Sequence, residues 1–313
     1  MPTTPIGNLK NNLMTPTVAI LLSTFNGENY IQTQIESLLK QRGCIVEIFL
    51  RDDGSKDSTV EIIKKMMVQH PSLHLSEGTN VGYKSSFFEL LFSVQHFGFY
   101  AFCDQDDIWL DTKLMSAIKY LKPIKGPALY SCKKIYVDSQ LNKLNIKDKT
   151  PPLTLDYGFF RGGACGCTMV WNDTFHQIIR RYVPKQPFKS HDDYVRCLAI
   201  ALGVSTFLDE NPQILYRRHA NNQSILPTKR IYRLFSQGIT KFGSRADLKK
   251  ICEDIKCGYS SELTKDAQVF IEQILAKDSL KSRLELMSNP NLKTIPSWEV
   301  YLLKFLIFLR GIN

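Results

Sequence analysis

Apolar and amphipathic segments alternate along the first half of the chain. A continuous apolar run at 18–23 has the pattern of a buried strand, and Ile31 and Ile35 then begin an apolar series at helical spacing. A second apolar run at 45–50 is again followed by a helical pattern. Strands that alternate with helices predict a parallel sheet covered by helices, which is an α/β fold.

The alternation continues through the middle of the chain. Ser58 and Glu61 have the spacing of a capping box, which predicts that the second helix begins there. A glycine-rich stretch at 162–166 lies in a later part where the pattern is less regular. From the periodicity we expect a helix at 87–94 and further strands at 73–75, 99–103, 128–131 and 168–171.

Composition changes near residue 226. After Pro227 the chain becomes rich in lysine and arginine at helical spacing. We therefore predict an N-terminal extension at 1–16, one main domain at 17–225 and a basic helical C-terminal region at 226–313. A chain of 313 residues is long enough to bury a substantial core in such an arrangement.

The chain is basic. It carries 40 lysines and arginines against 30 aspartates and glutamates, a formal net charge of +10. Such an excess suits a polyanionic partner, whether nucleic acid, an anionic membrane surface or a phosphate-bearing substrate. Nucleic acid is not expected, because the aromatic residues are not interleaved with the basic ones as in a known binding module.

The cysteines and the first residues bear on the compartment. The eight cysteines are scattered, and only Cys165 and Cys167 lie close together, at a spacing too tight for a CxxC zinc or redox motif. The first 17 residues lack the charged start and apolar run of a secretory signal. We therefore expect reduced thiols in a cytoplasmic protein.

Two carboxylate clusters each follow a predicted strand directly. Asp52 and Asp53 follow the second strand, and Asp104, Asp106 and Asp107 follow the strand at 99–103. Ligands of open α/β sheets bind beyond the carboxyl ends of strands, so both clusters are expected to face one cleft. Asp104 and Asp106 offer the hard oxygen ligands that suit Mg²⁺ or Mn²⁺ bound to a diphosphate. A helix-capping turn at 52–55 and a solvated loop at 104–107 remain alternative interpretations.

Two related phosphate-binding chemistries fit less well. The segment at 78–85 resembles a P-loop, but Tyr83 separates its glycine from Lys84 and the Gly-Lys-Ser junction is missing. A sugar-phosphate nucleotidyltransferase needs a glycine-rich loop after its first strand, where this chain has Thr24, Phe25 and Asn26.

Four motifs in a fixed order resemble glycosyltransferase family 2: STFNGE at 23–28, DDGS at 52–55, NVG at 80–82 and DQDDIW at 104–109. The similarity covers roughly residues 17 to 225. It implies a GT-A fold, a mixed sheet flanked by helices, and an inverting transfer from a nucleotide-diphospho-sugar. By this resemblance the donor-binding residues are Thr24, Asn26, Glu28, Asp52, Asp53, Asn80, Gly82, Lys84, Asp104, Gln105 and Arg218.

Inversion in a single displacement requires one general base on the acceptor side. The family places that base at the start of a helix, and the segment at 191–194 resembles this motif, with Asp192 as the expected base. Asp193 is the alternative base, and helix capping by Asp192 is an alternative role. Trp109, Gly166 and His191 are the expected acceptor-side residues.

The segment YRRHANN at 216–222 resembles a further family motif. Through it His219 is expected to join Asp104 and Asp106 as a metal ligand or to contact the diphosphate, although a structural role for this histidine stays open. These motifs together are most similar to bacterial rhamnosyltransferases of surface-polysaccharide assembly. The expected donor is dTDP-rhamnose, with a UDP-hexose of galactose, glucose or N-acetylglucosamine as the alternative. A noncatalytic polysaccharide-assembly scaffold is the alternative of another class.

The chain ends in an apolar run at 298–309 that Lys304 interrupts. It is too short to cross a bilayer, which needs about 20 residues. Enzymes of this branch act on saccharide or lipid-linked acceptors at the inner face of the membrane, so a peripheral membrane contact is expected here. Packing onto the main domain and a homodimer interface are equally open.

Overall fold

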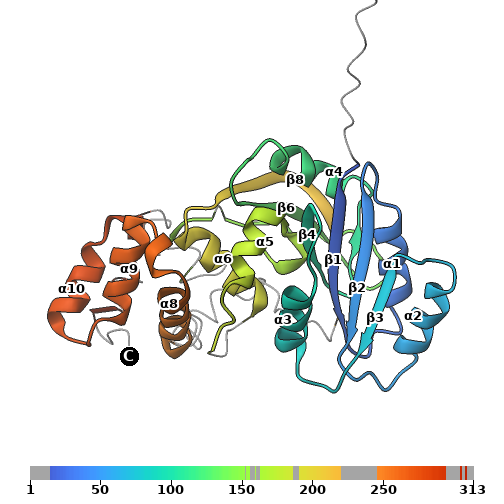
Figure 1. Ribbon diagram of the computed structural model, residues 1–313, viewed down its shortest axis with the longest axis horizontal. Helices are drawn as coiled ribbons and strands as arrows, with labels where there is room; N and C mark the ends of the chain where they lie inside the picture. Colours follow the sequence, from blue (N-terminus) through green and yellow to red (C-terminus); the bar gives the residue numbers. More distant parts are fainter. Residues whose placement is uncertain are drawn as a thin grey trace, which may run out of the picture.

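The computed structural model describes residues 15–151, 153–155, 159, 163–185, 190–219, 245–293, 304 and 307–308. The expected N-terminal extension, the boundary near 226 and most of the apolar run at 298–309 lie outside these residues. Within them the chain forms one sheet with helices on both faces and a helical C-terminal part (Figure 1).

Within the described residues, eight strands form the sheet in the order β3-β2-β1-β4-β7-β6-β8-β5. The neighbours β3, β2, β1 and β4 are parallel, whereas β7 is antiparallel to both β4 and β6, and β5 is antiparallel to β8. The sheet is therefore mixed, as expected. The strands are β1 (Thr17–Thr24), β2 (Ile45–Asp52), β3 (Leu73–Glu77), β4 (Phe99–Cys103), β5 (Ile108–Trp109), β6 (Ala128–Val137), β7 (Val170–Asn172) and β8 (Ser205–Arg217).

Side chains of β1 alternate between two hydrophobic cores, one on each face of the sheet. Ala19 and Leu21 join the core beneath α3 (Tyr83–Ser93), α5 (Asp173–Arg180) and α6 (His191–Ala201). Val18 and Ile20 join the core beneath α1 (Ile31–Leu39), α2 (Thr59–Met67) and α4 (Lys113–Leu121). A strand buried on both faces reads as a continuous apolar run, which explains the pattern at 18–23.

The structure confirms the predicted alternation and corrects it in two places. Ser58 caps no backbone amide with its side chain, so the predicted capping box with Glu61 is wrong. Its backbone amide instead donates to Glu28 Oε2 from another loop. The strand expected at 168–171 begins at Val170, because a 3₁₀ turn, η2 (Gly166–Thr168), precedes it.

The C-terminal helices pack against the main domain. They are α8 (Arg245–Tyr259), α9 (Lys265–Leu275) and α10 (Leu280–Ser288), and they lie at the end of the molecule away from α1 and α2 (Figure 1). Ile255 of α8 and Phe270 of α9 are fully buried in the same core as Tyr194 and Val195 of α6. The helix α6 is thus enclosed between the sheet and the C-terminal helices.

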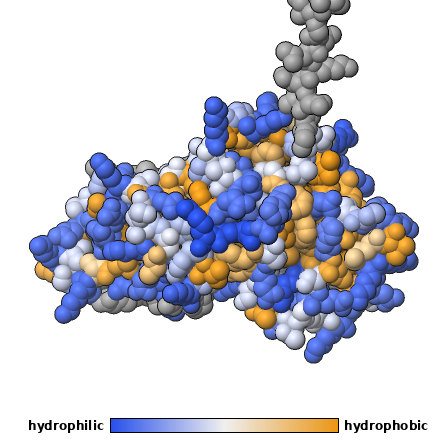
Figure 2. Space-filling model, viewed as in Figure 1, coloured by the Kyte–Doolittle hydropathy of each residue, from blue (hydrophilic) through white to orange (hydrophobic). Residues whose placement is uncertain are grey.

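No helix in the described part of the chain is both long and apolar enough to span a membrane. On the face shown in Figure 2, hydrophobic residues lie in small groups among hydrophilic ones. Of the described residues in the apolar run, Ile307 is buried in the core and Phe308 is exposed.

Candidate active site

The carboxyl ends of β1, β2 and β4 lie side by side, and the loops that follow them contact one another. Thr24 at the end of β1 donates through its hydroxyl to Gln105 Oε1 at 2.6 Å. The backbone amide of Asp53 donates to the Thr24 carbonyl at 2.8 Å. The two acidic clusters therefore share one edge of the sheet, as the sequence predicts.

Asn26 and Glu28 join the loop after β1 to the loop after β2. Asn26 Oδ1 accepts from the amide of Lys56 at 2.9 Å, and Glu28 Oε2 accepts from the amide of Ser58 at 3.0 Å. In the opposite direction, the amide of Asn26 donates to Ser55 Oγ at 2.9 Å. These five residues form a clasp between two loops that were expected to surround the donor.

Asp52 and Asp53 are both buried, and each holds a loop. Asp52 accepts from the amides of Gly54 and Ser55, so the turn interpretation describes its role in the structure. Asp53 accepts from the amides of Val81 and Gly82 at 2.8 and 2.9 Å. Gly82 has a φ of +83°, which a side chain would disfavour, and this turn directs both amides at Asp53.

The guanidinium of Arg51 also pairs with Asp53 Oδ1, at 2.7 Å. Asn80 and Lys84 flank the turn at exposed positions on the same side of the sheet. The expected donor residues of the first three motifs thus lie together around the ends of β1 and β2.

The loop after β4 directs its aspartates to two sides. Asp106 Oδ2 lies 2.7 Å from His219 Nε2, and the His219 ring stacks on Tyr30 with centroids 4.8 Å apart. Arg217 donates from Nε to the carbonyl of Asp106 at 2.8 Å. The carboxylate and imidazole that were expected to share a metal therefore converge, with side chains only 16% and 13% exposed.

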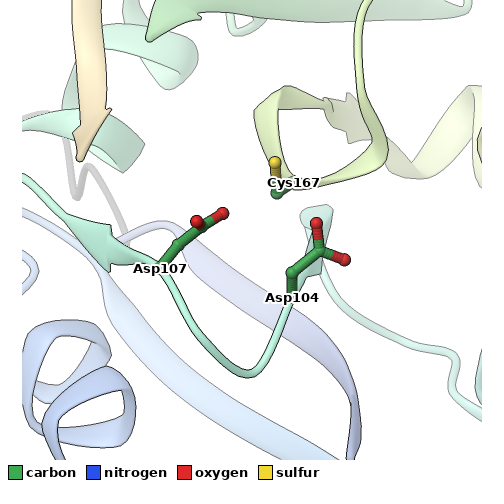
Figure 3. Close-up of side chains that lie close together, drawn as sticks. All are labelled: Asp104, Asp107 and Cys167. Atoms are coloured by element: carbon green, nitrogen blue, oxygen red, sulfur yellow. The ribbon is translucent and has the colours of Figure 1, made fainter. Parts of the chain in front are cut away.

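Asp104 and Asp107 lie beside the turn that carries Cys167 (Figure 3). Their ligand atoms and the Cys167 sulfur all lie within 4.8 Å of one another. Among the described residues, this trio rather than the predicted trio of Asp104, Asp106 and His219 forms the close group of potential metal ligands. The expected metal ligands are therefore divided between two neighbouring sites.

Acidic side chains are concentrated around Asp104, Asp107 and Cys167, which together form the inner group. Burial, and next the charges of Asp106 and Asp192, raise the pKa of Asp104 to about 7. Burial, and next the charges of Asp106 and Asp104, raise the pKa of Asp107 well above its usual value. Asp107 Oδ1 accepts from the amide of Arg217 at 3.0 Å, but the buried Oδ2 has no hydrogen-bond partner. These side chains suit a cation, because two carboxylates that lie so close cannot both be charged unless a cation lies between them.

Asp192 lies in the first turn of α6, held through both carboxylate oxygens. Oδ2 accepts from the amide of Gly166 at 3.0 Å, and Oδ1 accepts from the hydroxyl of Ser190. Burial opposes its charge, but His191, Arg196 and these hydrogen bonds together lower the pKa of Asp192 below its usual value. The group is an anion at neutral pH, as a general base requires.

Two residues beside Asp192 make structural contacts of their own. Ser190, rather than Asp192, is the helix cap, because its hydroxyl accepts from the amide of Asp193. Asp193 forms an ion pair with Arg196, whose side chain is 3% exposed. Asp193 is therefore engaged in an ion pair with Arg196, whose charge also helps to lower the pKa of Asp192.

The three expected acceptor-side residues occupy different surroundings. His191 is buried, stacks on Phe87 with centroids 3.8 Å apart, and lies so close to Gly166 that a side chain there would collide with its ring. Burial lowers the pKa of His191 to about 4. Trp109 is 2% exposed, and its ring packs under the ammonium of Lys113 in the core, away from Asp192.

Arg218 has a different position from the other expected donor residues. Its amide donates to the carbonyl of Val137, which continues the pairing of β6 with β8. Its guanidinium lies 5.9 Å from the centroid of the Tyr216 ring. Arg218 directly precedes His219 in the chain, so it lies next to the Asp106–His219 pair.

Sequence reasoning did not identify two residues near the aspartates. Cys167 was noted only for its spacing from Cys165, and a lone thiol carries no spacing signal for metal binding. Lys134 is 6% exposed, and its Nζ lies 2.9 Å from Cys165 Sγ. A lysine within a strand pattern is ordinarily interpreted as solvent-facing, so the burial of Lys134 was not predictable from the pattern.

Two known proteins are similar to this chain in sequence. The dTDP-rhamnosyl transferase RfbG of Shigella flexneri is 31% identical over 214 residues, which is 64% of this chain and 73% of that protein. The UDP-Glc:alpha-D-GlcNAc-diphosphoundecaprenol beta-1,3-glucosyltransferase WfaP of Escherichia coli is 23% identical over 75% of this chain and 90% of that protein.

Solved structures show the same fold. Residues 1–349 of S. aureus TarS in complex with UDP-GlcNAc match with a TM-score of 0.59 at 16% identity, over 95% of this chain and 88% of that one. The expected GT-A fold is thereby confirmed. A model of the family described as Glycosyl transferase family 2 matches residues 19–186, and the chain belongs to this family.

Proposed function

We propose that this protein is an inverting, metal-dependent glycosyltransferase that moves a sugar from a nucleotide diphosphate to a saccharide or lipid-linked acceptor. The first candidate donor is dTDP-rhamnose, because a dTDP-rhamnosyl transferase is the relative with 31% identity. A UDP-hexose is the second candidate, since a UDP-glucose-dependent enzyme is 23% identical over more of the chain. The name of this second enzyme gives a sugar on diphosphoundecaprenol as its acceptor. That name supports a lipid-linked acceptor for this chain, at the inner face of the membrane.

One relationship carries the proposal: the turn η2 contacts both halves of the site. Gly166 holds Asp192 through its amide, and the next residue, Cys167, lies beside Asp104. Asp104 and Asp192 are near enough for the charge of one to raise the pKa of the other. A donor diphosphate at Asp104 and an acceptor hydroxyl at Asp192 would therefore meet across a short gap.

The reaction then requires one proton transfer. Asp192 accepts the proton of the acceptor hydroxyl while that oxygen bonds to the anomeric carbon and the bond to the diphosphate breaks. The attack comes from the face opposite the leaving group, so the anomeric configuration inverts. The amide of Gly166 and the hydroxyl of Ser190 keep Asp192 oriented.

Mg²⁺ or Mn²⁺ supplies charge neutralisation to the leaving diphosphate when it is bound. Asp106 and His219 are the residues that would hold it, because their carboxylate and imidazole groups converge and suit these ions. The loop clasp of Asn26 and Glu28 would position the nucleotide beside them.

The test is release of nucleotide diphosphate from dTDP-rhamnose, UDP-galactose, UDP-glucose and UDP-N-acetylglucosamine, with Mg²⁺, Mn²⁺ or a chelator. We expect turnover of one donor that needs the metal and that Asp106→Ala abolishes. The anomeric configuration of the product, measured by NMR, checks inversion. Silence with every donor, together with the absence of donor binding, would favour the noncatalytic scaffold instead.

A further inference from the structure

The inner group of Asp104, Asp107 and Cys167 differs chemically from the outer pair of Asp106 and His219. The outer pair offers oxygen and imidazole nitrogen, whereas the inner group adds a sulfur ligand. Thiolate is a soft ligand that favours Zn²⁺ and similar ions over Mg²⁺. We propose that Asp104, Asp107 and Cys167 form a second cation site, selective for a thiophilic divalent ion such as Zn²⁺.

The strongest observation is the unpartnered oxygen of Asp107. The residue is 1% exposed, and its Oδ2 has no hydrogen-bond partner. A buried carboxylate oxygen without a partner is costly, and a coordinated cation removes that cost. The other oxygen is fixed by the amide of Arg217, so the carboxylate presents Oδ2 to the group in a defined orientation.

The dimensions suit a small ion. Zinc binds carboxylate oxygen at ~2.1 Å and thiolate sulfur at ~2.3 Å, which places tetrahedral donors ~3.5 Å apart. The three donor atoms here lie within 4.8 Å of one another, so the side chains would have to draw closer together around an ion. Cys167 and Asp107 are buried while Asp104 is partly exposed, so an ion would enter past Asp104 and keep an open position there.

The charge also balances. Two carboxylates and one thiolate carry three negative charges, of which a divalent ion neutralises two. The buried ammonium of Lys134 supplies the remaining positive charge, because it lies near enough to act on both Asp104 and Cys167. Buried charges are tolerated when they are paired in this way.

The site is testable without any donor sugar, so its outcome is separate from that of the proposed transferase reaction. The full chain, freed of metal, is titrated with Cd²⁺ or Co²⁺ while the thiolate-to-metal charge-transfer absorption is followed. We expect a band that saturates at one ion per chain. Cys167→Ser should abolish it, whereas Cys165→Ser, two residues away, and His219→Ala, in the outer pair, should retain it.

X-ray absorption of the zinc-loaded wild-type chain needs no variant and therefore does not depend on how Cys167→Ser folds. One sulfur neighbour at ~2.3 Å together with oxygen neighbours would support the site. A shell of only oxygen and nitrogen, or a charge-transfer band of equal strength in Cys167→Ser, would overturn it.

Discussion

Gly166 and Asp192 are joined by a hydrogen bond from the backbone amide of one to the carboxylate of the other, at 3.0 Å across 26 residues of sequence. The bond holds the Asp192 carboxylate without using any side chain of η2. Position 166 requires glycine, because a side chain there would meet the ring of His191.

Asp192→Asn should lower kcat by a factor of about 10² to 10⁴ and leave the KM for the donor nearly unchanged, since general bases contribute rate enhancements of that size. The measurement is steady-state release of nucleotide diphosphate, with donor affinity from calorimetry. Asp193→Asn is the matched comparison. It removes the negative charge that pairs with the buried Arg196, so we expect lower thermal stability but a smaller loss of kcat. The reverse ranking of the two kcat values would assign the base to Asp193.

His219→Ala should raise the Mn²⁺ concentration needed for half-maximal activity by about tenfold or more, because the loss of a metal-site partner typically weakens metal binding by such a factor. Tyr30→Phe preserves the ring that stacks on His219 and should change this concentration little. Metal titrations of turnover compare the two variants. Equal Mn²⁺ dependence in wild type and His219→Ala would leave His219 with a structural role.

Asn26→Ala and Glu28→Ala should each loosen the clasp between the first two loops. Each removes a side-chain acceptor of a backbone amide, worth about 1 kcal/mol in such exposed settings. The clasp holds the two loops in place before the donor binds. Its loss should therefore raise the donor KM while kcat stays similar. Initial-rate kinetics over a range of donor concentrations checks this, and a fall in kcat alone would contradict it.

Stability should decrease as the pH falls from about 6.5 toward about 4, in part through His176. Burial lowers the pKa of its ring to about 4, from an ordinary value of 6.5. The unfolded chain therefore takes up a proton before the folded chain does, and the free energy of unfolding drops across that window, by on the order of 2 kcal/mol by about pH 5. Asp104, whose pKa is raised, has the opposite effect.

The difference between wild type and His176→Gln isolates this contribution from those of the carboxylates. Urea unfolding at several pH values should show a flatter dependence in the variant. His96→Asn, at an exposed position with positive φ that asparagine tolerates, should keep the wild-type slope. Parallel slopes in wild type and His176→Gln would contradict the prediction.

Phe270→Ala in α9 should destabilise the whole protein by about 3–5 kcal/mol, because it removes a fully buried aromatic side chain from the core that encloses α6. Val269→Ala, next to it but half exposed, should cost less than about 0.5 kcal/mol. Thermal and urea unfolding measure both. Two separate transitions in Phe270→Ala, with the first affecting only the C-terminal helices, would show that those helices unfold independently.

The strands at 18–23 and 99–103 were predictable because a strand buried on both faces is apolar throughout, and the aspartates that follow it are placed by the sheet alone. The partnership of Asp106 and His219 followed from the family resemblance. The failed capping box at Ser58 shows the limit of local patterns, because Glu28 from another loop competes for its amide. Likewise, nothing near Cys167 in the sequence signals Asp107, since the contact depends on how β7 inserts between β4 and β6.

The burial of α6 between the sheet and α8 and α9 has a consequence for building chimaeric enzymes. An exchange of the chain beyond residue 226 for that of a relative would join foreign side chains directly beneath the helix that carries Asp192. Productive crossover points should therefore lie earlier, in the exposed loop at 138–142 after β6, so that α6 and the C-terminal helices are inherited together.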